Sequence, residues 1–362
     1  MSADVSVVGG GVIGLAAAWR CARIGMRVTV FDPAPGGGAS SVAAGMLAPV
    51  SETYFGEPRL TTLLVEAAAR WPGFAAELSG YGEVGYRADG TLVTALTPDD
   101  LVAASRLWRY QASLGLPVEE LSPAAMREAV PGLHPRVRGG ALVDDHQADP
   151  RRLLAALRAA AADAGVRVEP RKVAALAELD AGTVVVAAGT ASASLAGLPV
   201  RPVKGQLLRL RAPDGGGPGF RHVIRGYADG RRVYLVPRPD GEVVVGASEE
   251  ERTDPVPTAG AVLELLRAAT DLMPELSEYA LAEVCVGHRP GTPDNAPIVG
   301  TLPDGVVVAT GHYRHGILLA PLTADAVAEL LSTGTLPDAF APFGPSRFRG
   351  AARPVGRPEV GP

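Results

Sequence analysis

The sequence predicts a two-domain α/β protein, α+β overall, in which a parallel-sheet domain is interleaved with an antiparallel-sheet domain. Strand–glycine–helix units stand near both ends of the chain, at 5–25 and 306–331. Short alternating strands separated by turns fill the stretch 206–248. Because the α/β pieces lie at the start, middle and end, with the antiparallel pieces between them, two domains threaded through each other explain the order better than two consecutive domains.

The first unit has the length of a dinucleotide-binding unit. Val5–Val8 is a short apolar run that predicts a buried parallel strand. The segment GGGVIG and a helical stretch ended by Gly25 follow, and Arg27–Phe31 is the second strand, with Asp32 at its end. A strand–helix–strand unit of about thirty residues is typical of a Rossmann-like domain.

Gly9, Gly11 and Gly14 form the motif G-x-G-x-x-G between this strand and this helix. We assign the tight turn to Gly9, the close approach of the backbone to a pyrophosphate to Gly11, and the close packing of helix on sheet to Gly14. The helix N-terminus offers N–H donors to the phosphates. Asp32 is expected to bind ribose hydroxyls.

The remaining elements follow along the chain. Helices are predicted at Thr61–Leu78, Pro98–Leu114, Pro123–Ala129, Pro150–Ala164, Thr258–Leu272 and Gly316–Leu331. Strands are predicted at Gly85–Ala95, Gly139–Val143, Val166–Glu169, Thr183–Ala187, Tyr279–Gly287 and Val306–Ala309. The segments QLLRLRA, RRVYLVPR and EVVVGAS, with turns such as Pro239-Asp240-Gly241 between them, predict antiparallel sheet.

These elements give the domain boundaries. The cofactor-binding domain is assigned to residues 1–80, 146–205 and 284–340, and the substrate-binding domain to residues 81–145 and 206–283. A chain of 362 residues is long enough for two domains with substantial cores. The tail at 343–362, rich in Pro, Gly and Arg, is predicted to be disordered.

Composition argues against several other classes of protein. Hydrophobic residues make up 47% of the chain and charged residues 20%, and the formal net charge of −5 provides no basic field for nucleic acid. The two cysteines, Cys21 and Cys285, have no metal-binding spacing, so we expect neither a disulfide framework nor a metal site. We expect no signal peptide, no membrane-spanning stretch and no membrane partner, and therefore a cytoplasmic location.

The pattern favours FAD over NAD as the cofactor, bound without a covalent link. The nucleotide unit begins almost at residue 1 and is then interrupted, and the loop GGASSVAAGM supplies small residues able to wrap a long cofactor. At the far end, VVVATGHYRHGILLAP forms a second strand–glycine–helix unit. Its helix N-terminus is expected to face the flavin ring and to favour negative charge on reduced flavin.

Six segments in this order resemble the D-amino-acid oxidase superfamily of FAD-dependent flavoproteins, and within it the glycine oxidases of the thiamine pathway. They are GGGVIG, SSVAAGMLAP, PVKGQLLRL, RRVYLVPR, GHRPGTPDNAPIVG and GHYRHGILLAP, and the resemblance runs from Val5 to about Leu331. The AAGM segment and the last block point to the glycine oxidases. The resemblance implies an FAD-binding domain with an antiparallel substrate domain, and a homo-oligomer.

The resemblance also implies the site. Beyond the glycine motif, FAD is expected to contact Val12, Ile13, Asp32, Ser40, Ala44, Gly45, Met46, Val173 (through its backbone, on the adenine side) and, along the isoalloxazine, His312, Tyr313, Arg314, His315, Gly316, Ile317 and Leu318. Substrate is expected to meet Arg289, Tyr234 and Arg314. No catalytic residue beyond the flavin and no metal is expected.

Arg289 stands among small and apolar residues, and we interpret it as a fixed clamp for an anion. Its planar guanidinium is suited to bidentate binding of a carboxylate. Tyr234 is expected to donate its hydroxyl to the same carboxylate, with a further contact from Arg314. His222, His288, His312 and His315 are interpreted as hydrogen-bonded structural residues rather than as catalysts.

The resemblance implies oxidative deamination of glycine, and of other small amines, to an imine and then glyoxylate, with ammonia and hydrogen peroxide as further products and O2 as acceptor. The product would feed thiazole synthesis for thiamine, with a thiazole synthase as downstream acceptor. Two alternatives stay open: an oxidase or dehydrogenase for sarcosine or a small D-amino acid, and a non-catalytic flavin-binding protein. Whether an acidic residue of 249–251 faces the pocket also stays open.

Overall fold

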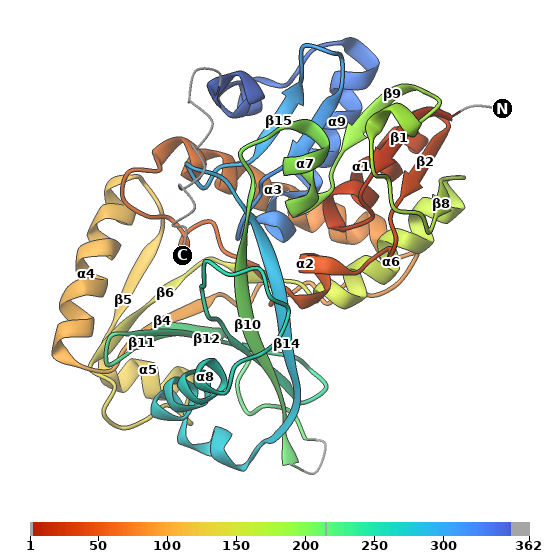
Figure 1. Cartoon of the computed structure of the whole chain (residues 1–362). Helices are drawn as coiled ribbons and strands as arrows, with labels where there is room; N and C mark the ends of the chain where they lie inside the picture. Colours follow the sequence, from red (N-terminus) through yellow and green to blue (C-terminus); the bar gives the residue numbers. More distant parts are fainter. Residues whose placement is uncertain (1–2, 214–215, 349–362) are drawn as a thin grey trace, which may run out of the picture.

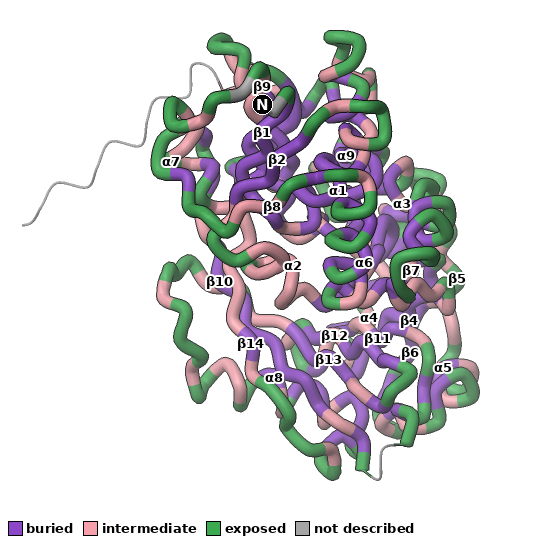
Figure 2. Tube along the Cα trace, turned by 90° about the vertical axis from the view of Figure 1, so that its right-hand side faces the viewer, coloured by how far each residue is buried: buried purple, intermediate pink, exposed green. Residues whose placement is uncertain are grey.

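The computed structural model describes residues 3–213 and 216–348 and has two parts, each built on one sheet (Figure 1). The upper part in Figure 1 holds a six-stranded, mainly parallel sheet, and the lower part holds an eight-stranded, mainly antiparallel sheet. Figure 2 shows that the central strands of both sheets are largely buried, while exposed residues lie mainly in the surrounding loops and helices. The predicted α/β class with interleaved sheets is confirmed.

The six-stranded sheet is the base of the nucleotide-binding part. Its strand order is β15-β16-β9-β1-β2-β8, with bounds Ile298–Thr301, Val307–Thr310, Ala181–Val186, Ala3–Val8, Val28–Phe31 and Arg167–Glu169. All neighbours are parallel except β15 and β16. In β1, Val5, Val7 and Val8 are buried. Such runs of buried β-branched residues suit a central parallel strand, which is covered on both faces.

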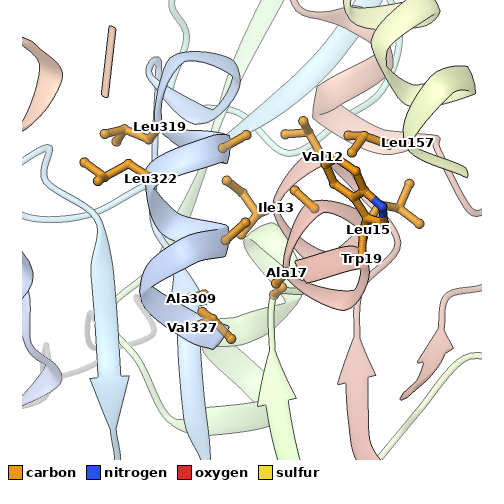
Figure 3. Packing of buried hydrophobic residues seen from close by; sticks show 14 of the residues in the cluster. Val12, Ile13, Leu15, Ala17, Trp19, Leu157, Ala309, Leu319, Leu322 and Val327 are labelled. Carbon is orange, nitrogen blue, oxygen red and sulfur yellow. The ribbon is translucent and has the colours of Figure 1, made fainter. Parts of the chain in front are cut away.

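Helices α1 (Val12–Arg23) and α9 (Gly316–Thr333) pack against each other on this sheet. Figure 3 shows Ile13 and Ala17 of α1 turned toward α9, with Val327 at the same contact. These three side chains belong to the largest buried apolar cluster. Two further helices complete that cluster, α3 (Pro58–Leu78) and α6 (Pro150–Asp163).

Helix α9 is apolar on nearly all sides. Within the described residues it is long and apolar enough to cross a membrane, by length and composition, so the expectation that no stretch reaches this length is wrong. More than half of its residues are buried inside the protein. A helix that is apolar all round suits a fully packed position, which α9 has between α1 and α3.

The eight-stranded sheet forms the lower part. Its order is β14-β10-β13-β12-β11-β4-β6-β5, with bounds Ala280–Gly291, Arg201–Arg211, Glu242–Gly246, Arg231–Pro237, Val223–Ala228, Thr91–Ala95, Gly139–Val143 and Val118–Leu121. One pair, β11 and β4, is parallel, whereas the sequence pattern predicted an antiparallel sheet. The helices of this part are α4 (Pro98–Ser113), α5 (Pro123–Ala129) and α8 (Ala259–Leu272).

Strands β10 and β14 join the two parts. They pair antiparallel from Arg201 and Gly291 at one end to Arg211 and Ala280 at the other. Figure 1 shows both as long strands that run from the lower sheet up to the nucleotide-binding part. The predicted boundaries at 205/206 and 283/284 fall inside these strands. The domain limits stay a prediction, and β10 and β14 belong to the eight-stranded sheet along their full length.

Several short elements have weak sequence patterns. These are α2 (Gly38–Val42), β3 (Met46–Leu47), β7 (His146–Gln147), α7 (Ser192–Ala196) and 3-10 turns at Leu176–Glu178, Gly189–Ala191 and Pro274–Glu278. The predicted strand at Gly85–Ala95 begins only at Thr91. Gly85 and Gly90 both have positive φ, 64° and 81°, which is incompatible with a continuous extended strand.

The predicted start of the disordered tail, at residue 343, is too early in the chain. The 3-10 turns Asp338–Phe343 and Pro345–Phe348 cover its first residues. Phe343 is buried, and the guanidinium of Arg347 lies 2.8 Å from the carboxylate of Asp294. Burial of an aromatic ring and this ion pair hold the segment on the body of the protein. The rest of the predicted tail, 349–362, lies outside the described residues.

Replacement of a buried leucine in this core should destabilise the fold. Leu15 of α1 is fully buried, so Leu15→Ala removes apolar contacts and leaves a cavity, and we expect a loss of about 2–5 kcal/mol in the free energy of unfolding. Leu263→Ala on α8, where the side chain is 47% exposed, is the matched control and should change stability by about 0.5 kcal/mol or less. Urea unfolding of both variants measures the difference, and equal losses would contradict the packing described.

Candidate active site

A cavity of about 690 Å³ is lined by residues of both parts. Its walls are the loop after β1, the segment 37–48, residues 172–174, the β10–β14 pair and the stretch 309–318 that leads into α9. The carboxyl ends of the parallel strands β1, β9 and β16 open onto it. This is the edge at which parallel sheets bind ligands, and the volume is typical of a cofactor site.

The glycine loop approaches other backbone too closely for side chains. Gly9 has φ +111°, and a Cβ there would lie 2.3 Å from the carbonyl oxygen of Ala187. A Cβ at Gly14 would lie 1.8 Å from the carbonyl oxygen of Gly9. At Gly11 the nearest atom would be Oγ of Ser40, at 3.2 Å, so its open side faces the cavity. The loop thus forms a cradle that a side chain at Gly11 would fill, as a bound pyrophosphate requires.

Asp32 fixes the shape of this loop. Its carboxylate accepts hydrogen bonds from the backbone N–H of Gly10, at 2.6 Å, and of Ala34, at 2.7 Å. The backbone N–H of Val12 donates to Oγ of Ser40, at 3.1 Å. Asp32 also lines the cavity, so the same carboxylate is placed to accept ribose hydroxyls. It therefore has a structural role that the spacing alone did not reveal.

The segment Ala44–Met46 is held from the other sheet. Gly45 has φ +84°, and a Cβ there would lie 2.0 Å from the carbonyl oxygen of Ala148. Arg238, at the end of β12, donates to the carbonyl oxygen of Ala44 and, at 2.9 Å, to Oε1 of Gln147. Burial lowers the pKa of Arg238 to about 10, so it stays charged at neutral pH. Arg238 is a positioning residue that sequence analysis missed.

The stretch before α9 presents neutral imidazoles and a helix N-terminus to the cavity. His312 and His315 are buried, and burial lowers their pKa values to about 3 and about 4, so both are uncharged at neutral pH. Nε2 of His312 lies 3.0 Å from Oγ1 of Thr323. The indole N–H of Trp71 donates to the carbonyl oxygen of Leu318, at 2.9 Å, and fixes the first turn of α9. That first turn has no acidic residue, so its positive dipole end is uncompensated within the helix.

Two glycines make room for the predicted clamp. Arg289 on β14 lies across Gly205 of β10, where a Cβ would come within 2.4 Å of the guanidinium. Tyr234 on β12 lies across Gly246 of β13 in the same way, at 2.2 Å from the phenol oxygen. Both side chains line the cavity, and Nη1 of Arg289 donates to the carbonyl oxygen of Ser248, at 3.1 Å.

Tyr234 is a hydrogen-bond donor in this setting. Burial raises the pKa of its phenol, and the opposing effect of Arg289 is smaller. The phenol therefore stays protonated at neutral pH and is able to donate to an anion held by the arginine.

Glu52 is a second residue that sequence analysis missed. It lines the cavity, its side chain is 10% exposed, and it forms ion pairs with Arg225 of β11 and with Nε of Arg314, the latter at 3.2 Å. Burial alone would raise the pKa of Glu52, but the charges of Arg225 and Arg314 hold it below its usual range. The only sequence signal was an acid shortly after the small-residue segment.

The structure brings the predicted site residues together. All of them line the cavity except Gly14, whose place is the contact between helix and sheet. Val173 lines it beside Lys172 and Ala174, and packs in one apolar cluster with Phe31, the residue before Asp32. The roles of these residues in binding stay predictions. Among the described residues, no group of three His, Cys, Asp or Glu side chains is arranged to hold a metal ion.

Lys204, His222 and Cys285 lie outside the cavity. Fully buried Lys204 donates to Asp254 and, at 2.6 Å, to the carbonyl oxygen of Val256, so it anchors a loop. His222 hydrogen-bonds the carbonyl oxygen of Asp89. Cys285 is buried in an apolar cluster, and burial raises the pKa of its thiol.

The acidic stretch 249–251 does not line the cavity. Glu249 accepts a hydrogen bond from the phenol of Tyr313, at 2.7 Å, and its carboxylate lies 4.0 Å from Arg314. Glu250 accepts from Nε2 of Gln206, and Glu251 pairs with Arg201. The stretch thus supports residues around the cavity from outside.

Gly11→Ala should weaken cofactor binding without harm to the fold. The added methyl group meets only Oγ of Ser40, at 3.2 Å, and otherwise enters the cavity, so we expect lower FAD occupancy after dialysis and a melting temperature of the cofactor-free protein close to wild type. Gly73→Ala in α3, where a Cβ meets no atom within 4 Å, is the matched control and should keep full occupancy. Equal FAD retention in Gly11→Ala and Gly73→Ala would remove Gly11 from the cofactor site.

Comparison with known proteins supports the same cofactor. Residues 4–330 match the family described as FAD dependent oxidoreductase. The glycine oxidase of Geobacillus kaustophilus (strain HTA426) is 33% identical over 96% of this chain and 97% of its own length. The crystal structure of glycine oxidase from Geobacillus kaustophilus superimposes with a TM-score of 0.89, covering 96% of this chain and 99% of that one.

A longer relative matches as well. The bifunctional protein ThiO/ThiG of Synechocystis sp. is 35% identical over 98% of this chain but only 55% of its own length, so this chain spans about half the length of the bifunctional relatives it matches. The glycine cradle, the cavity and these similarities agree on FAD, which confirms the predicted cofactor. The chain belongs to the family of FAD-dependent oxidoreductases.

Proposed function

We propose that this protein is an amino-acid oxidase that deaminates glycine, and other small amines, to an imine and then glyoxylate, with ammonia and hydrogen peroxide as further products and O2 as acceptor. The observation that carries the proposal is Arg289, an arginine with room made for it by Gly205, beside a protonated Tyr234 in the cavity that fits FAD. The similarity to proteins named glycine oxidase supports the same activity.

Arg289 and Tyr234 bind and orient the substrate carboxylate. The guanidinium offers parallel N–H donors, and the phenol adds a third donor from β12, two strands further along the same sheet than β10. Because β14 and β12 belong to one sheet, the two groups are held by a rigid scaffold rather than by loops. An α-amino acid fixed by its carboxylate has a restricted position for its α-carbon, and such positioning lowers the entropy cost of the reaction.

FAD, when bound, supplies the two-electron oxidation of the amine to an imine. Residues 312–318 line the cavity with uncharged imidazoles and the N-terminus of α9. Because both histidines are uncharged, they add no positive charge to the cavity wall. The uncompensated N–H groups of α9 are suited to stabilise negative charge at the cofactor.

We also propose a downstream partner. Several relatives carry the name bifunctional protein ThiO/ThiG and are about twice the length of this chain. This supports transfer of the product to a thiazole synthase in thiamine synthesis. A homo-oligomeric state and a cytoplasmic location stay predictions.

Loss of the clamp should act on substrate binding. Arg289→Ala removes a charged contact, which typically contributes about 1.5–3 kcal/mol, so we expect the apparent KM for glycine to rise by about 10- to 150-fold while FAD stays bound. Arg289→Lys should recover part of the affinity because it keeps the charge but loses the bidentate geometry. Arg109→Ala, an exposed arginine of α4, is the control and should leave KM unchanged. A KM near wild type for Arg289→Ala would exclude the clamp.

A further inference from the structure

Glu52 is a largely buried acid in the cavity wall to which the proposed function assigns no role. Its side chain lies between two arginines, Arg225 behind it and Arg314 beside the cavity, and is ion-paired to both. An acid with two such partners is ionised at any neutral pH. The cavity wall at this point therefore consists of a charge pair rather than of a free cation.

Hydrogen bonds fix the backbone of the segment that carries Glu52. The fully buried Asp145 accepts hydrogen bonds from the backbone N–H groups of Val50, at 2.8 Å, and Ser51, at 3.0 Å. The hydroxyl of Thr53 donates to the carbonyl oxygen of Pro49, at 2.7 Å. These bonds flank Glu52 on both sides and fix its backbone, which places the carboxylate where it pairs with both arginines.

The two cavity-lining arginines consequently differ in charge balance. Within the described residues, Arg289 forms no ion pair, and its hydrogen bond goes to an uncharged carbonyl oxygen. Arg314 is paired with Glu52 and has a second, exposed carboxylate, that of Glu249, at 4.0 Å. The positive charge of Arg289 is thus available to an anionic ligand, whereas that of Arg314 is balanced by a carboxylate.

We propose that the Glu52–Arg314 ion pair selects substrates with a single anionic group and rejects amines that carry a second carboxylate. A second carboxylate would have to lie beside Glu52, against like charge, or displace it and leave a buried acid unpaired. Either outcome is unfavourable for the larger anion and leaves a monocarboxylate bound at Arg289 unaffected. The inference rests on the proposed function, because it takes Arg289 as the site of the first carboxylate.

Inert anions test this selection without turnover. Acetate carries one carboxylate and malonate two, and calorimetry on the FAD-loaded protein gives the affinity of each. In Glu52→Gln, which keeps the shape but removes the charge, the malonate-to-acetate affinity ratio should rise by about tenfold or more, because Arg225 and Arg314 lose their anionic partner. Adding Arg314→Gln to Glu52→Gln should abolish most of this rise.

Two further variants make the test decisive. Glu249→Gln removes an exposed acid at 4.0 Å from the same arginine and should change the ratio by about twofold at most. If Glu52→Gln does not fold, Glu52→Asp takes its place: the shorter acid cannot reach both arginines, so a smaller rise in the same direction is expected. An unchanged ratio in the folded Glu52 variant, or an equal rise in Glu249→Gln, would overturn the proposal.

Glycine oxidation measured alongside separates this inference from the proposed function. Glycine turnover in wild type with no shift of the anion ratio in the Glu52 variants contradicts the selection alone. A shift of the ratio in a protein that does not oxidise glycine contradicts the proposed activity and leaves the selection of anions supported.

Discussion

The antiparallel pairing of β10 with β14 is the constraint on which the site depends. The pair spans the distance between the two sheets, so it sets where the substrate part meets the cofactor part. Gly205 and Gly287 face each other in this pair, and the absence of a side chain at Gly205 lets Arg289 lie across β10. A larger residue there would push the guanidinium out of the cavity, and the clamp would be lost.

The cofactor half depends on close approach of backbone to backbone. Gly9 and Gly14 leave no space for side chains, whereas Gly11 leaves space on the cavity side. Arg238 then ties the cofactor segment at Ala44 to the substrate sheet. The cofactor segment is thus tied to the substrate sheet through Arg238, whereas the clamp is held within that sheet by the space at Gly205.

Much of this arrangement could be predicted from the sequence. The glycine spacing and Asp32 depend on local geometry, and Arg289 was conspicuous among small residues. Glu52 and Arg238 were not predictable in this way, because their partners, Arg225 and Ala44, lie 173 and 194 residues away in the chain. The parallel pairing of β4 with β11 is likewise a long-range feature that periodicity does not encode. The apolar length of α9 has two interpretations until its packing against α1 and α3 is known.

The visible absorption spectrum of the purified protein, recorded before and after anaerobic addition of glycine, tests the central claim most directly. The account predicts a yellow protein whose flavin bands bleach with glycine and return, with release of hydrogen peroxide, when air is admitted. Flavin bands that glycine leaves unchanged would contradict the proposed substrate. A colourless protein that cannot be reconstituted with FAD would contradict the site itself.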